Sequence, residues 1–191
     1  MPDSNLLNIS DFLSKVSTSG FARANRVTVQ IFPPAELVRL IPAAAIAARN
    51  LTYSAEQVTL PGRILQASDI NIYGPPIKAP TRTLYNDLNV TFLCDDFMVQ
   101  RDFFDAWINF VNPAEQGFNM RYRDDYIGNI NIFQMNERGN KANYGIRLYE
   151  AYPLIINDMG GNWVDNEVQR LQVQFSYRYW ENIPTALLGV V

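Results

Sequence analysis

The segment YNDLNVTFLCDDFMVQRDFFDAWINFVNP, Tyr85 to Pro113, carries the clearest structural signal of this chain, a strand that leads directly into an aromatic helix. The apolar residues Leu88, Val90, Phe92 and Cys94 occupy alternate positions, a spacing that gives a strand one buried face. From Asp95 or Asp96, either of them a suitable N-cap, apolar residues recur at helical spacing until Asn112-Pro113. The helical set is Phe97, Phe103, Phe104, Trp107, Ile108 and Val111. A helix this apolar has to pack under a sheet or against a neighbouring subunit.

The remainder of the chain reads mainly as strands separated by turns that contain Gly and Pro. Pro61-Gly62 breaks one strand from the next, and Gly74-Pro75-Pro76 turns the chain. With 191 residues and 48% hydrophobic content, the chain is long and apolar enough for one well-packed domain. The last two predicted strands form a long antiparallel hairpin. The predicted strands cover residues 26–31, 56–60, 64–73, 81–85, 118–122, 127–135, 144–156 and 168–180.

Three segments are predicted to be two terminal arms and one insertion of the domain. Residues 1–20 form an N-terminal arm with a short amphipathic turn, which either folds back on its own domain or packs on a neighbour. Residues 183–191, IPTALLGVV, form an apolar C-terminal arm that should be buried on its own sheet or in an adjacent subunit. Residues 33–50 are Ala-rich and predict one or two helical turns, with Pro42 at a first turn. We expect them to meet another subunit, against the alternative of a lid over the core, through exposed Leu37, Val38, Leu40, Ile41 and Ile46.

The composition argues against a catalytic centre. The chain has no His, which is the usual general base and the commonest metal ligand, and its one cysteine rules out a disulfide within the chain. Cys94 reads as a buried core residue rather than a reactive thiol. The cluster RYRDDY, residues 121–126, reads as a turn with local ion pairs or complementary charge between subunits, rather than paired catalytic carboxylates. Asp95-Asp96 with Asp158 lacks the spacing of a calcium loop. We expect no enzyme activity, no cofactor and no metal.

The charge of the chain and its N-terminal residues indicate which kinds of partner to expect. The net charge of -3 disfavours tight binding to a polyanion. Arginine supplies most of the cations, the exceptions being Lys15, Lys78 and Lys141, and arginine is favoured at protein interfaces. A bias toward arginine codons would give the same count. The first residues do not resemble a signal peptide and no apolar run approaches a membrane span, so we expect no membrane anchor and assembly in a cytoplasm.

Several segments, by their order and spacing, resemble the tail tube proteins of contractile-tailed bacteriophages. Besides residues 85–113, they are GFARANRVTVQI (20–31), EQVTLPGR (56–63), YEAYPLIIND (149–158) and LQVQFSYRYWE (171–181), the last being an aromatic strand that ends in Trp-Glu. The resemblance implies a mainly β fold: an antiparallel β-sandwich or small barrel with one main α-helix, spanning residues 21–182. The insertion at residues 33–50 is a departure from the short phage tube proteins.

The resemblance also implies a function and partners. Six copies would form a ring, and rings would stack into a hollow tube inside a contractile sheath. The implied partners are other copies of the chain, the tail sheath protein, and baseplate and tail terminator proteins, with transient, non-specific passage of double-stranded DNA. The protein would belong to the virion tail and be assembled in the host bacterial cytoplasm. Alternatives are a tube initiator or terminator ring at the baseplate or neck, a tube subunit of a phage-like protein-delivery particle and, more remotely, a monomeric ligand-binding β-sandwich.

Two sets of residues are predicted to serve assembly. The subunit-interface candidates lie at the strand break, in the charged turn and in the C-terminal arm: Leu60, Pro61, Gly62, Arg121, Arg123, Leu187 and Leu188. The lumen-facing candidates are the polar residues that alternate with the apolar ones in the last strand: Gln172, Gln174 and Ser176. Their side chains offer hydrogen bonds without a dense positive field, which suits a channel but is also ordinary on any sheet.

Overall fold

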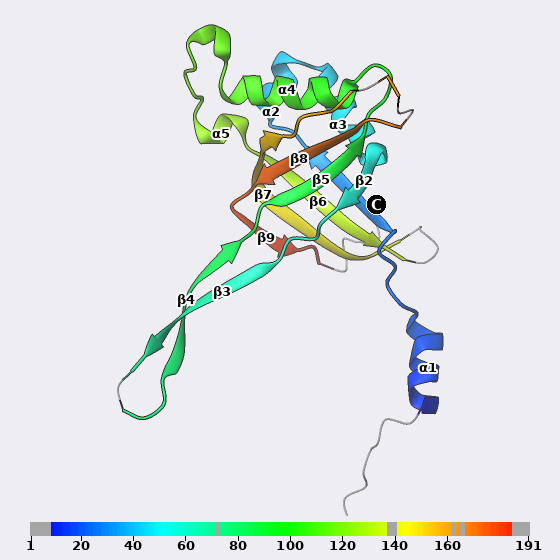
Figure 1. Cartoon of the computed structure of the whole chain (residues 1–191), viewed down its shortest axis with the longest axis vertical. Helices are drawn as coiled ribbons and strands as arrows, with labels where there is room; N and C mark the ends of the chain where they lie inside the picture. Colours follow the sequence, from blue (N-terminus) through cyan, green and yellow to red (C-terminus); the bar gives the residue numbers. More distant parts are fainter. Residues whose placement is uncertain (1–8, 72, 137–140, 162, 165–166, 185–191) are drawn as a thin grey trace, which may run out of the picture.

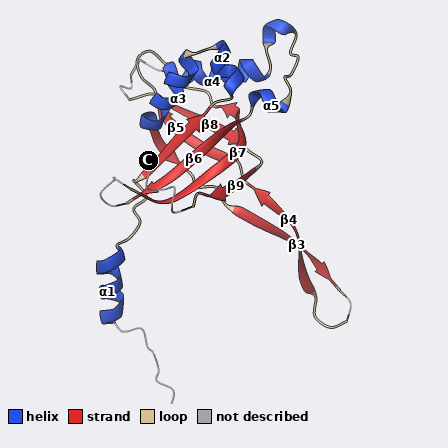
Figure 2. Cartoon of the chain, turned by 180° about the vertical axis from the view of Figure 1, so that it is seen from behind, coloured by secondary structure: helices blue, strands red, loops and turns tan. Residues whose placement is uncertain are grey.

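The structure is a computed structural model that describes residues 9–71, 73–136, 141–161, 163–164 and 167–184. Its body is a sandwich of antiparallel strands with a group of helices over one end (Figure 1). Two appendages leave the opposite end, helix α1 (Ile9–Ser19) and the hairpin of β3 (Arg63–Ile70) and β4 (Ile77–Tyr85). The view from behind shows the same separation of helices and appendages (Figure 2).

The long strand β7 (Ala142–Ile156) belongs to both layers of the sandwich. Its first half pairs with β6 (Gly128–Met135) and β9 (Tyr179–Asn182), and β6 pairs in turn with β1 (Val27–Phe32). Its second half pairs with β8 (Arg170–Ser176), which continues through β5 (Leu88–Leu93) to β2 (Ala55–Val58). β1 and β2 are the two edges of this path, so the described strands do not close into a barrel. The expected mainly β, antiparallel sandwich is confirmed.

The helix α4 (Val99–Val111) supplies the aromatic centre of the core. Phe104 lies 5.3 Å from Phe92 of β5 and 5.7 Å from Phe175 of β8, measured between ring centroids. The side chain of Trp107 is fully buried, and its Nε1–H donates to the carbonyl of Tyr126 at 3.0 Å. The aromatic residues of α4 thus pack against the sheet of the same chain, which is the first of the two arrangements expected from the sequence. Shorter helices surround α4: α2 (Ala35–Leu40), α3 (Ala43–Ser54), the 3-10 turn η1 (Ala114–Gln116) and α5 (Arg123–Tyr126).

Gly128 begins β6 at a point where three elements converge. A Cβ atom at this position would lie 2.3 Å from the carbonyl oxygen of Phe32 and 3.1 Å from the ring of Trp107. A side chain would therefore collide with the backbone of β1, which cannot move aside like a flexible side chain. Glycine is needed here for close approach of the strand rather than for an unusual φ angle.

β7 passes from one layer to the other at Glu150. Glu150 has φ 55°, in the left-handed region, and the pairing register with β6 shifts beside it. The strand is interrupted between β8 and β9 at the same corner, where Arg178 N donates to the carbonyl of Tyr149 at 3.1 Å. The carboxylate of Glu150 accepts hydrogen bonds from Arg178 Nη1 at 2.8 Å and from Arg123 Nε at 2.9 Å. These bonds join α5, β7 and the β8–β9 break.

The start of the main helix differs from the prediction. The N-cap position of α4 is Met98, in the left-handed region at φ 53°, rather than Asp95 or Asp96. Asp95 still accepts a hydrogen bond from Val99 N at 3.1 Å through Oδ1, so it satisfies a donor of the first turn. Phe97 precedes the helix, so its assignment to the helical apolar set was wrong, and it is 84% exposed.

Four other expectations are corrected. Residues 118–122 form an irregular excursion rather than a strand, and Phe118 has φ 59°. The predicted strand 168–180 is split into β8 and β9, because the chain changes layers at Tyr177 and Arg178. The insertion forms two helices, of which α3 is longer than the predicted one or two turns. Leu37 is fully buried in the core instead of exposed, while Leu40, Ile41 and Ile46 are exposed as expected.

Candidate assembly surfaces

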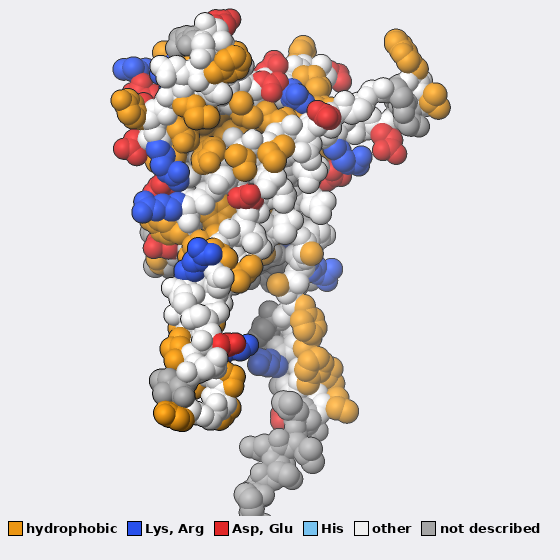
Figure 3. Space-filling view, turned by 60° about the vertical axis from the view of Figure 1, so that its left-hand side comes forward, with side chains coloured by type: hydrophobic (Ala, Val, Ile, Leu, Met, Phe, Trp, Pro, Cys, Tyr) orange, Lys and Arg blue, Asp and Glu red, His pale blue; other side chains and the backbone are white. Residues whose placement is uncertain are grey.

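The β3–β4 hairpin projects from the body with almost all of its side chains in solvent. Its strands pair apolar residues across the ladder, Ile64 with Leu84 near the body and Ile70 with Ile77 near the tip. In the space-filling view, hydrophobic side chains gather toward the tip of the hairpin (Figure 3). An isolated two-stranded hairpin is marginally stable in water, and exposed apolar pairs are unfavourable there. This hairpin is therefore suited to pack on another molecule.

The base of the hairpin is fixed to the body by an aromatic cluster. The guanidinium of Arg63 lies 4.4 Å from the ring centroid of Trp180 and 5.6 Å from that of Tyr85, and its Nη2 donates to the carbonyl of Trp180 at 3.2 Å. Tyr85 also contacts Tyr177, whose hydroxyl donates to the carbonyl of Asn86 at 2.7 Å. Contacts on both strands thus set the direction in which the hairpin leaves the sandwich.

The predicted contact residues Leu60, Pro61 and Gly62 lead into β3. Leu60 is exposed, Pro61 is half-buried, and a Cβ at Gly62 would meet no atom within 4 Å. They lie at the end of the body from which the hairpin projects, away from α5 at the helical end (Figure 1). Their role in subunit contacts remains a prediction.

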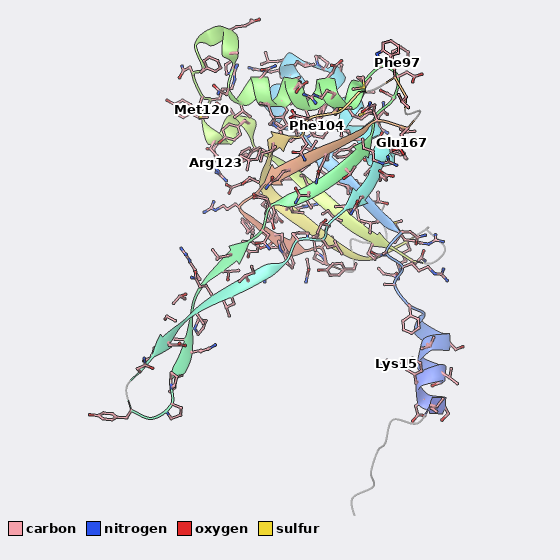
Figure 4. The ribbon with its side chains drawn as sticks, in the orientation of Figure 1. Lys15, Phe97, Phe104, Met120, Arg123 and Glu167 are labelled. Carbon is pink, nitrogen blue, oxygen red and sulfur yellow. The ribbon has the colours of Figure 1, made fainter. Side chains whose placement is uncertain are left out.

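The charged cluster of residues 121–126 forms contacts within its own chain. Arg121 donates from Nε to the carbonyl of Phe110 at 3.0 Å and its guanidinium lies 4.4 Å from the Phe110 ring centroid. Arg123 pairs with Glu150, and Figure 4 shows it at the edge of the sandwich below Met120. The structure therefore does not bring these arginines together with the strand break. Leu187 and Leu188 lie outside the described residues.

The lumen candidates lie on a polar outer face of the sandwich. Gln172 pairs with Thr91, and Gln174 pairs with Asn89 across the β5–β8 ladder. Leu171, Val173 and Phe175 are buried on the opposite side, so the alternation predicted from the sequence is confirmed. The Gln172 amide oxygen accepts from Asn157 at 2.8 Å and the Gln174 amide donates to Asp87 at 2.8 Å. Ser176 ends β8 at the same face and is half-buried.

This polar face is hollowed beside β2. A depression of about 720 Å³ is lined by Gln57, Thr91, Asn157, Asp158 and Gln172, together with the ion pair of Glu56 and Arg170. Arg170 Nε lies 2.8 Å from Glu56 Oε2, and this pair raises the pKa of Arg170. Acidic and amide groups dominate the lining, and its one cation is neutralised by a neighbour. The face can accept hydrogen bonds but offers little attraction to a polyanion.

The chain that folds into this sandwich, main helix and projecting hairpin matches a known protein family. A family model described as phage tail tube protein matches residues 22–182. The chain belongs to the phage tail tube protein family. The resemblance drawn from the sequence is thereby confirmed over most of the chain, and this family member is a structural tube protein of a phage-like particle. No curated protein sequence matches it.

Several solved structures have the same fold. A chain of an extracellular contractile injection system, the PVC sheath-tube complex in the extended state, has a TM-score of 0.63 and 11% identity, over 89% of this tail tube family member and 96% of that chain. A chain of the PVC sheath/tube terminator gives 0.59 and 10%, over 85% and 96%. A chain of the anti-feeding prophage baseplate gives 0.57 and 13%, over 87% and 98%. At these identities the similarity establishes the fold.

The tail tube chain shows few reactive groups. Cys94 is half-buried against the core, and burial, followed by the nearby Asp95 carboxylate, raises the pKa of its thiol, which disfavours the reactive thiolate. Among the described residues, no cluster of three or more acidic or cysteine side chains could hold a metal ion. None of the described helices combines the length and apolar character needed to cross a membrane.

Two exposed features of this tail tube family member were not predicted from the sequence. The excursion between α4 and α5 carries exposed Phe118, Met120 and Tyr122, and Figure 4 shows Met120 away from the sandwich. A groove also separates α3 from α4, on the helical end. The alternation of apolar residues at 118–122 predicts a strand, which is the wrong element for this exposed segment. The groove left no sequence signal, because it arises from how two helices pack.

Proposed function

We propose that the protein is the main subunit of a hollow tube, built from stacked rings of six copies, that lies inside a contractile sheath and passes double-stranded DNA. The ring size, sheath and cargo come from the family resemblance. The observation that carries tube formation is the β3–β4 hairpin, which projects from one end of the body with its apolar cross-strand pairs in water. Docked on a copy in the adjacent ring, the hairpin would bury these pairs.

The geometry of the appendages supports stacking over a closed dimer. The hairpin and the helical end lie at opposite ends of the molecule (Figures 1 and 2). A contact between unlike ends is heterologous, and such contacts propagate along an axis instead of closing after two copies. Repetition of the contact gives each added ring a new surface for the next one. Interface roles for Leu60, Pro61 and Gly62 fit this arrangement, because these residues lead directly into β3 at the base of the hairpin.

For the lumen, we propose the polar face that carries Gln172, Gln174 and Ser176. Its amides and hydroxyls would keep a water layer along the wall, and the pairing of Arg170 with Glu56 removes a phosphate-binding charge. DNA affinity depends mainly on the number of phosphates neutralised, so this wall would release its cargo readily. Arg121 and Arg123 stay proposed contacts of the ring, although both are already engaged within the chain.

A second candidate is a ring that initiates or ends the tube. The observation behind it is that the fold also matches a terminator structure, with a TM-score of 0.59 against 0.63 for a sheath-tube complex. Scores this close do not separate a tube body from an end ring. Assembly in solution distinguishes the two functions, because an end ring closes laterally but offers only one stacking surface.

The test is assembly of the purified protein over a concentration series, followed by sedimentation velocity and negative-stain electron microscopy. We expect open tubes of uniform width that lengthen as concentration rises. The double substitution Ile70→Ser with Ile77→Ser should prevent tubes and leave rings or monomers. The neighbouring pair Asp69 and Lys78 supplies the matched control, because its double substitution to serine alters the opposite face of the same hairpin. Rings of constant size at every concentration would support the end-ring function, and monomers throughout would contradict both.

A further inference from the structure

Helix α1 presents an apolar stripe to solvent. Ile9, Phe12 and Leu13 follow helical spacing with the less exposed Val16, and their exposed fractions are 76%, 57% and 59%. Hydrophobic side chains line one side of the helix in Figure 3, and Figures 1 and 2 show the helix standing clear of the sandwich. An amphipathic helix with its apolar side in water is expected to find a partner.

The helical end of the same chain has an apolar groove between α3 and α4. It measures about 520 Å³, and its small side chains Ala43, Ala47 and Ala106 come from both helices. Ile46 lines it as well, and this side chain is 66% exposed in the single chain. Small residues let another helix approach the groove closely. The exposed side chain of Ile46 could then pack on that helix.

One charge on the helix has an opposite charge at the groove. Asp102 of α4 lines the groove. Lys15 follows the stripe residues of α1 at a position that flanks the stripe, and Figure 4 shows it on the exposed helix. An apolar helix face laid in an apolar groove, with a lysine set against an aspartate at the margin, is a common mode of peptide recognition.

In the structure, the connection to β1 carries α1 away from the helical end of its own chain, where the groove lies (Figures 1 and 2). Arg23 is held at the base of the sandwich, where its carbonyl accepts from Gln134 Nε2 at 2.8 Å, so the tether between α1 and the body is residues 20–22. That tether reaches about 10 Å when extended. β1, with six residues, is about 20 Å long and separates Arg23 from the helical end.

We therefore propose that α1 docks in the α3–α4 groove of a second copy of this chain. The proposal rests on the proposed stacking function, because α1 and the groove lie at opposite ends of the molecule and meet when copies stack head to tail (Figure 1). The contact is separate from that of the hairpin. It gives each copy a second link to its neighbour, and it gives the insertion at residues 33–50 a role in assembly.

Cross-linking of assembled protein tests the docking. In a Cys94→Ser background, Leu13→Cys and Ala47→Cys are placed on one chain, which is assembled, treated with a short bis-maleimide and run on a denaturing gel. Docking between copies predicts a ladder of linked oligomers. The control replaces Leu13→Cys by Ser14→Cys, which lies on the other side of α1, and should give a much weaker ladder. A monomer band alone, or equal ladders from both pairs, would overturn the proposal.

The same samples separate this proposal from the stacking function. Microscopy before cross-linking reports whether tubes formed. Tubes without the ladder would overturn α1 docking and leave the tube function standing, whereas a ladder without tubes would support docking and count against the tube. As a second measurement, Phe12→Asp should raise the concentration needed for assembly by about tenfold or more, because it places a charge in the groove. Ser14→Asp, on the side of α1 away from the stripe, should leave that concentration unchanged, and equal effects from both substitutions would contradict the proposal.

Discussion

Glu150 Oε1 accepts a hydrogen bond from Arg178 Nη1 at 2.8 Å, and this contact joins the two places where the chain changes layers. Glu150 is the left-handed residue at the corner of β7, and Arg178 lies in the break between β8 and β9. Arg123 from α5 binds the second carboxylate oxygen at 2.9 Å. A single carboxylate therefore holds the strand that both layers share, the break opposite it and the helix beside it.

This arrangement predicts a pH dependence of stability. Hydrogen bonding from Arg178, and to a smaller extent from Arg123, holds the pKa of Glu150 below its ordinary value of 4.5. A carboxyl group with a lowered pKa in the folded state stabilises the fold above its unfolded pKa, and that contribution is lost as pH falls through the folded pKa. Glu150→Gln should lower the melting temperature at pH 7 by about 2 to 4 °C.

The difference between Glu150→Gln and wild type should disappear in acid below the lowered pKa. Calorimetry at pH 7 and at an acid pH below that pKa measures it. Glu115→Gln, which removes an exposed carboxylate from η1, is the control and should match wild type at both values. A difference that stayed constant with pH would show that Glu150 stabilises the corner by packing instead of by charge.

Phe104 and Phe97 provide a direct comparison of a buried and an exposed phenylalanine near the same helix. Phe104 is fully buried among Phe92, Phe103 and Phe175, whereas Phe97 is 84% exposed. Phe104→Ala should lower the free energy of unfolding by about 3 to 5 kcal/mol, through lost burial and the cavity left behind. Phe97→Ala should change it by less than about 0.5 kcal/mol. Urea denaturation gives both values, and equal losses would contradict the assigned core.

Gly128→Ala tests the close approach of β6 to β1. The added methyl group would overlap the carbonyl oxygen of Phe32 and press on Trp107, so the strand has to shift. We expect a loss of about 1 to 3 kcal/mol in the free energy of unfolding, as for other overpacked sites. Gly161→Ala is the control, since a Cβ there would meet no atom within 4 Å. Urea denaturation that found Gly128→Ala as stable as wild type would refute the predicted collision.

Tyr177 should ionise later than the exposed tyrosines. Burial, with smaller contributions from Asp87 and Tyr85, raises the pKa of Tyr177 to about 12. Because the folded pKa lies above the unfolded value of 10.0, the stabilisation is complete below pH 10 and is lost as pH rises toward 12. Absorbance titration of the phenolate should show a late step that is absent from Tyr177→Phe. A wild-type curve that coincides with that of the variant would contradict the buried hydroxyl.

The local sequence pattern predicted the helices and strands that are buried on one face only. The alternation of Leu88, Val90 and Phe92 identified β5, and the spacing of Phe104 and Trp107 identified α4, because hydrophobic periodicity reflects which side faces the core. Phe97 fits the same helical spacing, but Met98 adopts a left-handed conformation that starts the helix after it. Periodicity does not report that local choice of backbone.

Which strands pair with one another over long distances in the chain could not be predicted from the sequence. The alternation of the last strand continues through Tyr177 and Tyr179, so it gave no sign that the chain changes partners at the Glu150 corner. The strands of the hairpin were anticipated, but their detachment from the sandwich was not, since exposed Ile64 and Ile70 look like core residues. In the proposed stack, the surface that buries these side chains lies on another copy, and the pattern within one chain does not identify that surface.

The most direct test of the central claim is a cryo-electron microscopy reconstruction of the assembled protein. We predict stacked six-membered rings in which the β3–β4 hairpin of each copy lies against a copy in the adjacent ring, with Gln172 and Gln174 facing the lumen. A reconstruction with the hairpins in solvent and ring contacts made elsewhere would contradict the account, as would particles that never stack.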